Sequence, residues 1–352
     1  MLAAIHQHDT PVADFTAQAL LDEVGLEKSL CDVTFVRDCI VRTASALSAS
    51  LKKAVPVSHY GVGSALLKEV ASNRRIVDAN RKAAFSRGSS SPDRTIGDMP
   101  VGLIDPHLRT LSFWNGKEPV AAMSTYAVHP MSFYGEGRVG YDFVGMAREQ
   151  MKKEIRGTQY LYFSGCSGDV VAGKYNDRSP EERPKLAGRM YAAMHEAWVK
   201  TIRHELTVAE FRSVTMQLPM RETEAFVEAE QRKVLENPEA KPFKRNLAAM
   251  GLSWRKAHAE GRGIDVPSVD FGKAQFLFMP AESFVHYQLQ AQKERPNQVV
   301  LVAGYGESAP GYIPSPKAID DKFIEGHTWC WVDHEAPGPM HEAIKHSLMA
   351  PP

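Results

Sequence analysis

Apolar residues recur along this chain with two different spacings. Spacings of three to four positions are typical of amphipathic helices, whereas short runs rich in β-branched and aromatic residues are typical of strands. The first pattern predicts helices over residues 13–30, 32–53, 64–72, 140–155, 181–203, 222–236, 240–260, 282–293 and 339–348. The second predicts strands over residues 54–63, 111–114, 120–128, 159–163, 207–218, 274–279 and 298–303. Strands that alternate with helices indicate an α/β protein with a mixed β-sheet core covered by helices.

Turn residues link these elements. Asn115-Gly116 lies between two β-prone runs, which predicts a type I′ hairpin whose second strand leads to His129-Pro130. Glycines surround a second turn, at residues 164–169, directly after the strand at 159–163. Residues 75–100 are rich in Arg, Ser, Asp and Pro, so we expect a surface loop there. The hairpin therefore places a histidine at the end of a strand.

The composition is that of an ordinary globular protein. The chain has 352 residues, of which 43% are hydrophobic and 24% charged, with 25 Gly, 22 Pro and 4 Cys. Collagen-like repeats, a disulfide scaffold and a disordered polyelectrolyte all require composition biases that this sequence lacks. Lys plus Arg total 42 and Asp plus Glu total 42, so the zero net charge gives no reason to expect a nucleic acid or an anionic membrane as partner. At roughly 100–200 residues per domain, the length predicts one large or two medium domains.

The cysteines and the N-terminus give information on the cellular compartment of the protein. Cys31, Cys39, Cys166 and Cys330 are few and scattered, which predicts buried free thiols rather than a disulfide framework or paired zinc ligands. No apolar run approaches the roughly 20 residues that span a bilayer, and the N-terminus lacks the features of a signal peptide. The sequence as written therefore predicts a cytoplasmic protein. Because Met1 lies only five residues before a histidine pair, we also expect a preceding segment, and an export signal on it would make the protein secreted or periplasmic.

Two motifs resemble known sites but fail on their chemistry. Residues 168–174 nearly match the phosphate-binding loop GxxxxGK[ST], but Tyr175 stands where Ser or Thr must bind magnesium and begin a helix. His341 and His346 resemble the zinc-protease pair of HExxH, but five positions turn about 500° around a helix, so the two do not share a face. We therefore expect a loop at the first motif, a surface helix at the other, and no nucleotide site.

A different group of residues is suited to bind a metal. His6 and His8 follow the apolar run 2–5, and on a strand residues two positions apart point to the same side. His129 follows another β-prone run, and Glu282 begins an apolar stretch after a Met-Pro pair. Imidazole nitrogens from strand ends with one carboxylate are the usual ligands of catalytic zinc. Spacing alone leaves open whether these residues converge.

Six motifs occur in an order that resembles the catalytic domain of the neutral/alkaline, non-lysosomal ceramidases, in a divergent bacterial branch. They are the HxH pair, Asn73-Arg74-Arg75, Val128-His129-Pro130, Gly165-Cys166-Ser167-Gly168-Asp169-Val170, Pro280-Ala281-Glu282 and Gly311-Tyr312-Ile313-Pro314. The resemblance covers about residues 1–330. It implies a single large catalytic domain spanning residues 1–352, without the N-terminal segment and the C-terminal immunoglobulin-like domain of the family.

The resemblance also implies a zinc amidase. His6, His129, Glu282 and Tyr312 would bind one zinc ion, and the tyrosine is the least usual of these ligands. Zinc lowers the pKa of bound water to about 7 and polarises a carbonyl, so that hydroxide attacks an amide at neutral pH.

Three further residues form the catalytic set that the resemblance implies. His8 would lie beside the metal-bound water and relay a proton to the leaving amine. Arg74 would lie near the polar head of the substrate, and Asp169 belongs to the glycine-rich turn of the family site. The expected partner is a small-molecule or lipid-like amide, related to ceramide or another N-acyl amide. The oligomeric state stays open.

The sequence departs from the family pattern at two positions. Val171 stands where the ceramidases have a catalytic serine, and Ile324 stands where a second tyrosine is expected, although the adjacent Glu325 is kept. Ser167 lies in the same turn in a different register, so we expect it to serve loop structure. Two hypotheses follow: a zinc-dependent amide hydrolase, or a catalytically inactive homologue that binds metal or ligand without turnover.

Overall fold

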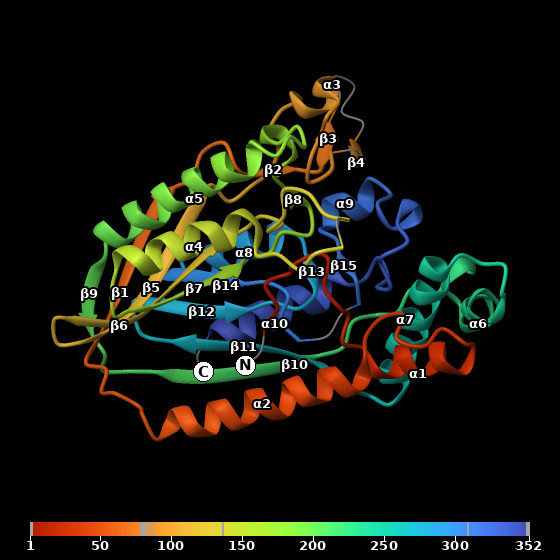
Figure 1. Ribbon diagram of the computed structural model, residues 1–352, viewed down its shortest axis with the longest axis horizontal. Helices are drawn as coiled ribbons and strands as arrows, with labels where there is room; N and C mark the ends of the chain where they lie inside the picture. The colour runs from red at the N-terminus through yellow and green to blue at the C-terminus, as the bar shows by residue number, and fades with distance from the viewer. Residues whose placement is uncertain (1–2, 78–82, 86, 136, 308–309, 350–352) are drawn as a thin grey trace.

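Two β-sheets face each other at the centre of the protein (Figure 1). The computed structural model describes residues 3–77, 83–85, 87–135, 137–307 and 310–349. The first sheet has the strand order β7 (Gln159–Ser164), β6 (Glu118–Tyr126), β5 (His107–Asn115), β1 (His59–Leu66) and β9 (Ile202–Glu205). The second sheet has the order β10 (Glu210–Met216), β11 (Ile264–Asp270), β12 (Ala274–Phe278) and β14 (Val299–Ala303). Each sheet is mixed, because β6 pairs with β7 and β12 with β14 in parallel while the other neighbours are antiparallel.

Helices cover the outer face of each sheet. The first sheet packs against α4 (Asp142–Glu154) and α5 (Glu182–Val199), and the second against α8 (Val285–Glu294) and α10 (Pro337–Leu348). Between the sheets, Tyr60 and Leu111 from the first belong to one apolar cluster with Phe276 and Leu301 from the second. The chain is therefore a single α/β domain with a layer of helices on each side of two packed sheets, as the sequence predicted.

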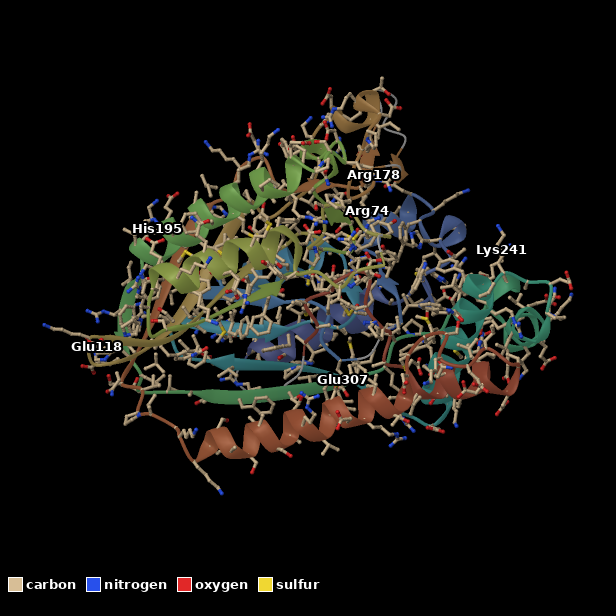
Figure 2. All side chains as sticks on the ribbon, viewed as in Figure 1. Arg74, Glu118, Arg178, His195, Lys241 and Glu307 are labelled. Atoms are coloured by element: carbon tan, nitrogen blue, oxygen red, sulfur yellow. The ribbon has the colours of Figure 1, made fainter. Side chains whose placement is uncertain are left out.

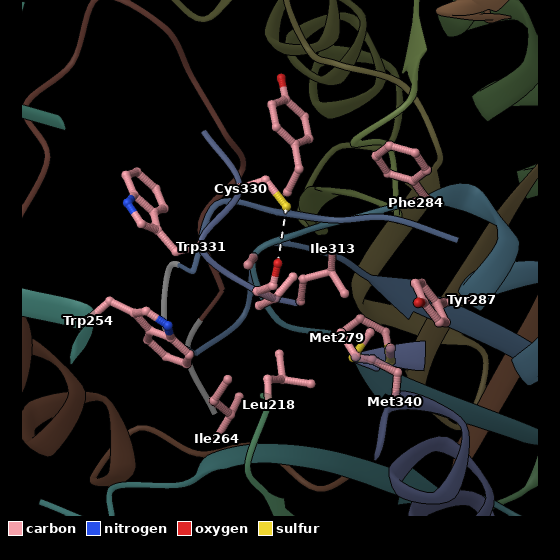
Figure 3. Packing of buried hydrophobic residues seen from close by; sticks show 14 of the residues in the cluster. Leu218, Trp254, Ile264, Met279, Phe284, Tyr287, Ile313, Cys330, Trp331 and Met340 are labelled. Carbon is pink, nitrogen blue, oxygen red and sulfur yellow. Dashed lines mark hydrogen bonds between the residues drawn. The ribbon is translucent and has the colours of Figure 1, made fainter. Parts of the chain in front are cut away.

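A large apolar cluster lies on the helix side of the second sheet and extends toward α1 (Phe15–Glu23), α6 (Glu228–Glu236) and α7 (Pro242–Ala259). Figure 3 shows Met279, Ile313 and Met340 within this cluster. Met279 and Ile313 are fully buried, and they precede Glu282 and follow Tyr312 in the chain. Packing of these apolar neighbours therefore fixes the backbone at two of the predicted site residues.

Short strand pairs join segments that lie far apart in the sequence. β2 (Ser72–Asn73) pairs with β8 (Val170–Val171), and β13 (Glu282–Ser283) pairs in parallel with β15 (Tyr312–Ile313). β3 (Arg75–Val77) pairs with β4 (Ala83–Phe85). Two short helices, α3 (Arg94–Gly97) and α9 (Pro316–Asp320), lie in segments between the longer elements. The first two pairs bring the motifs around Arg74, Asp169, Glu282 and Tyr312 to one region of the fold.

Most predicted elements are confirmed, including the Asn115-Gly116 hairpin, but the predictions at 64–72 and 75–100 are wrong and one strand was missed. The helix predicted at 64–72 is absent, because β1 continues to Leu66 and pairs with His107 of β5. The surface loop predicted at 75–100 contains β3, β4 and α3. The strand β11 was missed, because Pro267 disfavours a strand, although the residue lies opposite Ser213 in the ladder.

The helix predicted at 32–53 is present as α2 (Val33–Leu51), and none of its residues is buried. The segment that nearly matches a phosphate-binding loop forms the short strand β8 and a single 3-10 turn at Gly173–Tyr175, so the loop expected there is only partly present. His341 and His346 are exposed on α10, as expected for a surface helix. All four cysteines are free, and Cys39 alone among them is only half-buried. Among the described residues, no helix combines the length and the apolar character needed to cross a bilayer.

Candidate metal centre

Three predicted ligands from distant parts of the chain meet in the structure. His129 lies just beyond β6, Glu282 begins β13, and His6 lies in the N-terminal segment. The Nε2 atoms of His6 and His129 lie 3.3 Å apart. Oε2 of Glu282 lies 3.5 Å from Nε2 of His6 and 3.3 Å from Nε2 of His129. The structure therefore brings together the two imidazoles and the carboxylate that the sequence singled out.

The N-terminal segment reaches the site without forming a strand, so the strand expected for the HxH pair is wrong. His6 instead has a φ of 60°, in the left-handed region that non-glycine residues rarely adopt. The amide N–H of Ala4 donates to the carbonyl of Tyr305 at 2.8 Å, and the His6 ring stacks on the Tyr305 ring with centroids 4.1 Å apart. The rings of His6 and His8 still come together, with centroids 4.7 Å apart. Tertiary contacts, rather than strand alternation, bring the two imidazoles together.

The orientation of His129 is fixed by backbone acceptors. Its Nδ1 atom lies 2.7 Å from the carbonyl oxygen of Ser167 and 3.2 Å from that of Val170. Carbonyl oxygens only accept, so Nδ1 carries the proton and Nε2 presents a lone pair to the site. Burial, followed by the nearby charge of Arg74, lowers the pKa of His129 to about 3. His129 is therefore a neutral imidazole at neutral pH, which is the form that binds metals.

Glu282 is held between close backbone neighbours. Glu282 pairs with Tyr312 in the parallel ladder of β13 and β15. Gly168 approaches the Glu282 backbone so closely that an added Cβ atom would lie 2.2 Å from the Glu282 carbonyl oxygen. Burial alone would raise the pKa of the Glu282 carboxyl, but its contacts with His6 and His129 hold that pKa well below its usual range. Burial also raises the pKa of Tyr312, and the neighbouring Glu282 charge adds to the shift. Tyr312 is therefore a neutral phenol beside an ionised carboxylate.

These side chains suit a divalent cation. Oε2 of Glu282 is buried without a hydrogen-bond donor among the described residues, and the two facing Nε2 atoms add imidazole nitrogens. A second set of ligands is also close, because His6, His8 and His129 each offer an atom within 4.8 Å of the others. Burial lowers the pKa of His8 to about 4, so this ring too is neutral at neutral pH. Nitrogen and carboxylate ligands of this kind fit zinc.

Two further predicted residues, Arg74 and Asp169, differ in how they relate to the candidate metal centre. Nη2 of Arg74 lies 3.1 Å from Nε2 of His129, so the guanidinium competes with a cation for that lone pair. Asp169 instead accepts from the Asn73 side chain and from the Val285 amide, each at 2.8 Å. Burial raises the pKa of Asp169 to about 6. In the structure Asp169 ties β2 to the start of α8, and its predicted catalytic role stays a prediction.

The two departures from the family pattern are apolar in the structure as well. Val171 is fully buried in β8, and its carbonyl accepts from the hydroxyl of Ser72. Ile324 is also buried, in the large apolar cluster. The carbonyl of Ser167 orients His129, and its hydroxyl lies 2.7 Å from the Tyr305 hydroxyl, so the expected role of Ser167 in the loop structure stays a prediction.

A cavity of about 760 Å³ opens onto the candidate metal centre. His6, His8, Glu282 and Tyr312 line it on one side, and the apolar wall consists of Ile5, Val12, Phe243, Met250, Trp329 and Trp331. Figure 2 shows Arg74 among the central elements, whereas the exposed side chains of Glu118 and Lys241 lie toward the periphery. Tyr305 and the two tryptophans were not predicted from the sequence, although the flanking Gly304 and Gly306 mark an irregular segment.

Comparison with solved structures identifies the fold. A crystal structure of neutral ceramidase from Pseudomonas aeruginosa superposes with a TM-score of 0.62 over 97% of this chain, at 16% sequence identity. This chain has the neutral ceramidase fold. A second structure, a ceramidase complexed with C2, matches with the same TM-score and identity over 98% of this chain.

The comparison covers only part of each ceramidase. This chain covers 59% of the length of the first ceramidase and 60% of the second. No model of a known protein family matches the sequence, and no curated protein matches it. At this identity the likeness establishes the fold, and the activity has to be argued from the site residues themselves.

Proposed function

We propose that the protein is a zinc-dependent hydrolase that cleaves an amide bond in a ceramide- or N-acyl-amide-like substrate. One observation carries the proposal: the Nε2 atoms of His6 and His129 converge with the Glu282 carboxylate in a chain that has the neutral ceramidase fold. His6, His129, Glu282 and Tyr312 would hold the zinc ion. Bound zinc would supply a Lewis acid that activates water and polarises the amide carbonyl.

The protein residues have separate tasks in this reaction. The carbonyls of Ser167 and Val170 keep the proton of His129 on Nδ1, so that Nε2 stays a ligand. Nδ1 of His8 lies 3.1 Å from the carbonyl of His6, which leaves its Nε2 to accept a proton and to pass it to the leaving amine. Arg74, on the cavity wall, would bind the polar head of the substrate.

Metal content tests the proposal directly. We expect purified protein to contain about one zinc per chain by elemental analysis, and a His6→Ala, His129→Ala double variant to contain none. His334→Ala is the control, because that side chain is exposed and lies outside the site. Unchanged zinc in the double variant, or no zinc in the parent protein, would exclude the proposed centre.

Val171 and Ile324 support a second hypothesis, that of a protein that binds metal or ligand without turnover. Neither residue can supply the hydroxyl that the ceramidases have at that position. A panel of N-acyl amides distinguishes the two hypotheses. Hydrolysis of any member, lost in a folded Glu282→Ala variant, supports the hydrolase, whereas stoichiometric zinc without hydrolysis supports the binding protein.

A further inference from the structure

A second, smaller cavity also has Arg74 in its wall. It has a volume of about 180 Å³, and Arg74, Arg87 and His327 line it together with Phe284, Tyr312 and Phe323. Arg74 and Tyr312 also line the larger cavity at the metal centre, so the two cavities adjoin. A ligand with its amide at the metal centre could therefore place an attached group in the smaller cavity.

Arg87 brings a buried positive charge to this cavity. The residue is 2% exposed, and its Nη atoms donate to backbone carbonyls, those of Asn73, Ile96, Gly97, Met99 and Pro100. Its Nε is buried and has no hydrogen-bond partner among the described residues. Burial also lowers the pKa of Arg87 from its usual value. The guanidinium charge is therefore balanced within the described contacts by carbonyl dipoles and not by a carboxylate.

Two more hydrogen-bond donors line the same cavity. Nε of Arg74 is buried and lacks a partner among the described residues. The amide of Trp329 donates to Nδ1 of His327 at 3.3 Å, so a neutral His327 ring carries its proton on Nε2. Phe323 stacks on the His327 ring at 4.6 Å, and Tyr312 packs edge-on at 4.6 Å. The His327 ring is thus held in place by aromatic neighbours.

We propose that the smaller cavity binds a compact oxyanion, a carboxylate or a phosphate, attached to the amide substrate. The positive charges of Arg74 and Arg87 favour such a group electrostatically, and the His327 N–H and the Nε atoms of the two arginines are the donors left for it, because charge-assisted hydrogen bonds to an anion are roughly twice as strong as neutral ones. Among the described residues, no carboxylate side chain lines this cavity to compete with it. A neutral head group would leave buried donors without a charged acceptor, which is unfavourable. The amide part of this inference rests on the proposed function, whereas the binding of an oxyanion does not.

Matched probes test the inference by equilibrium binding, measured calorimetrically. N-lauroylglycine is compared with its neutral analogue N-lauroylglycinamide, and N-lauroylethanolamine phosphate with N-lauroylethanolamine. We expect the anionic member of at least one pair to bind about tenfold more tightly or better, and the pair that shows this preference distinguishes carboxylate from phosphate. The titrations are repeated after chelation, because a metal ion also binds these anions. The preference has to persist without metal.

Variants locate the binding site. His327→Ala should reduce the preference for the anionic probe about fivefold or more and leave the affinity for the neutral probe within about twofold. Arg74→Gln should also reduce the preference about fivefold or more, and it should weaken the binding of both probes because Arg74 lines both cavities. His334→Ala is again the control, and circular dichroism confirms that each variant folds. The inference is overturned if neither anionic probe binds preferentially, if both variants keep the full preference, or if chelation abolishes it. Zinc content is measured on the same samples, so loss of the proposed metal centre and loss of the oxyanion site are separate outcomes.

Discussion

Nε2 of His129 lies 3.3 Å from Oε2 of Glu282, although the two residues come from the end of β6 and the start of β13. The Ser167 and Val170 carbonyls hold the ring proton at the opposite nitrogen, so a lone pair faces a carboxylate. Two buried acceptors at this distance are unfavourable unless a proton or a cation lies between them. Nη2 of Arg74 lies 3.1 Å from Nε2 of His129 and faces its lone pair, but Oε2 of Glu282 has no donor among the described residues. The pair therefore still provides a geometric reason to expect a cation.

The two candidate ligand sets make different predictions for zinc affinity. Glu282→Gln should weaken zinc binding about 100-fold or more, because it removes a charged ligand. His8→Ala should weaken it less than about tenfold, because His8 lies outside the proposed ligand set. Competition with a chromophoric chelator measures both values. The reverse order would show that His6, His8 and His129 are the ligands.

Gly168 positions the Glu282 backbone by its lack of a side chain. A Cβ atom there would lie 2.2 Å from a backbone oxygen, so Gly168→Ala has to displace β13. We expect a loss of about 1–3 kcal/mol in the free energy of unfolding, together with weaker zinc binding. Gly188→Ala in α5 is the matched control, because nothing lies within 4 Å of the added atom and alanine favours a helix by about 1 kcal/mol. Equal stability of the two variants would contradict the steric argument.

Asp169 should make stability depend on pH. Burial raises its pKa from 3.8 to about 6. Because the folded pKa exceeds the unfolded one, this group stabilises the fold below about pH 4, and the contribution is lost as the pH rises through about 6. Asp169→Asn removes the titration, although it also loses one accepted hydrogen bond at every pH.

Urea denaturation of both proteins at pH 4, 5.5 and 7 measures this effect. The free energy of unfolding of the parent protein, relative to the variant, should fall by about 2 kcal/mol between pH 4 and pH 7. Other titrating groups are common to both proteins and cancel in the difference. A difference that stays constant with pH would show that the carboxyl titrates normally.

Arg87 should be essential for the loop that surrounds it. Its guanidinium donates hydrogen bonds to the carbonyls of Asn73 and of residues 96, 97, 99 and 100, so Arg87→Met leaves several buried acceptors unpaired. We expect a loss of about 3 kcal/mol or more in the free energy of unfolding, and faster amide exchange in the loop. Arg42→Met is the matched control, since that side chain is 74% exposed and should change stability by less than about 1 kcal/mol.

Local patterns were sufficient to predict much of this fold. The Asn115-Gly116 hairpin and the helices corresponding to α4, α5 and α10 depend on turn chemistry and on apolar periodicity, which are properties of neighbouring residues. The helix predicted at 64–72 failed because a strand partner that lies about 40 residues away overrides a weak local preference. Element type was thus predictable wherever the deciding contacts are local.

The sequence by itself determined which residue types were available for a metal centre: His6, His129 and Glu282 beside strand-like or apolar segments, with Val171 and Ile324 in place of hydroxyls. Only the tertiary structure decided that three of these side chains meet within 3.5 Å and that Asp169 accepts from the Val285 amide at the start of α8. It also placed Tyr305 against His6, and His327 with Arg87 around one cavity. The physical reason is that convergence depends on strand pairing and core packing between distant segments, which local spacing does not encode.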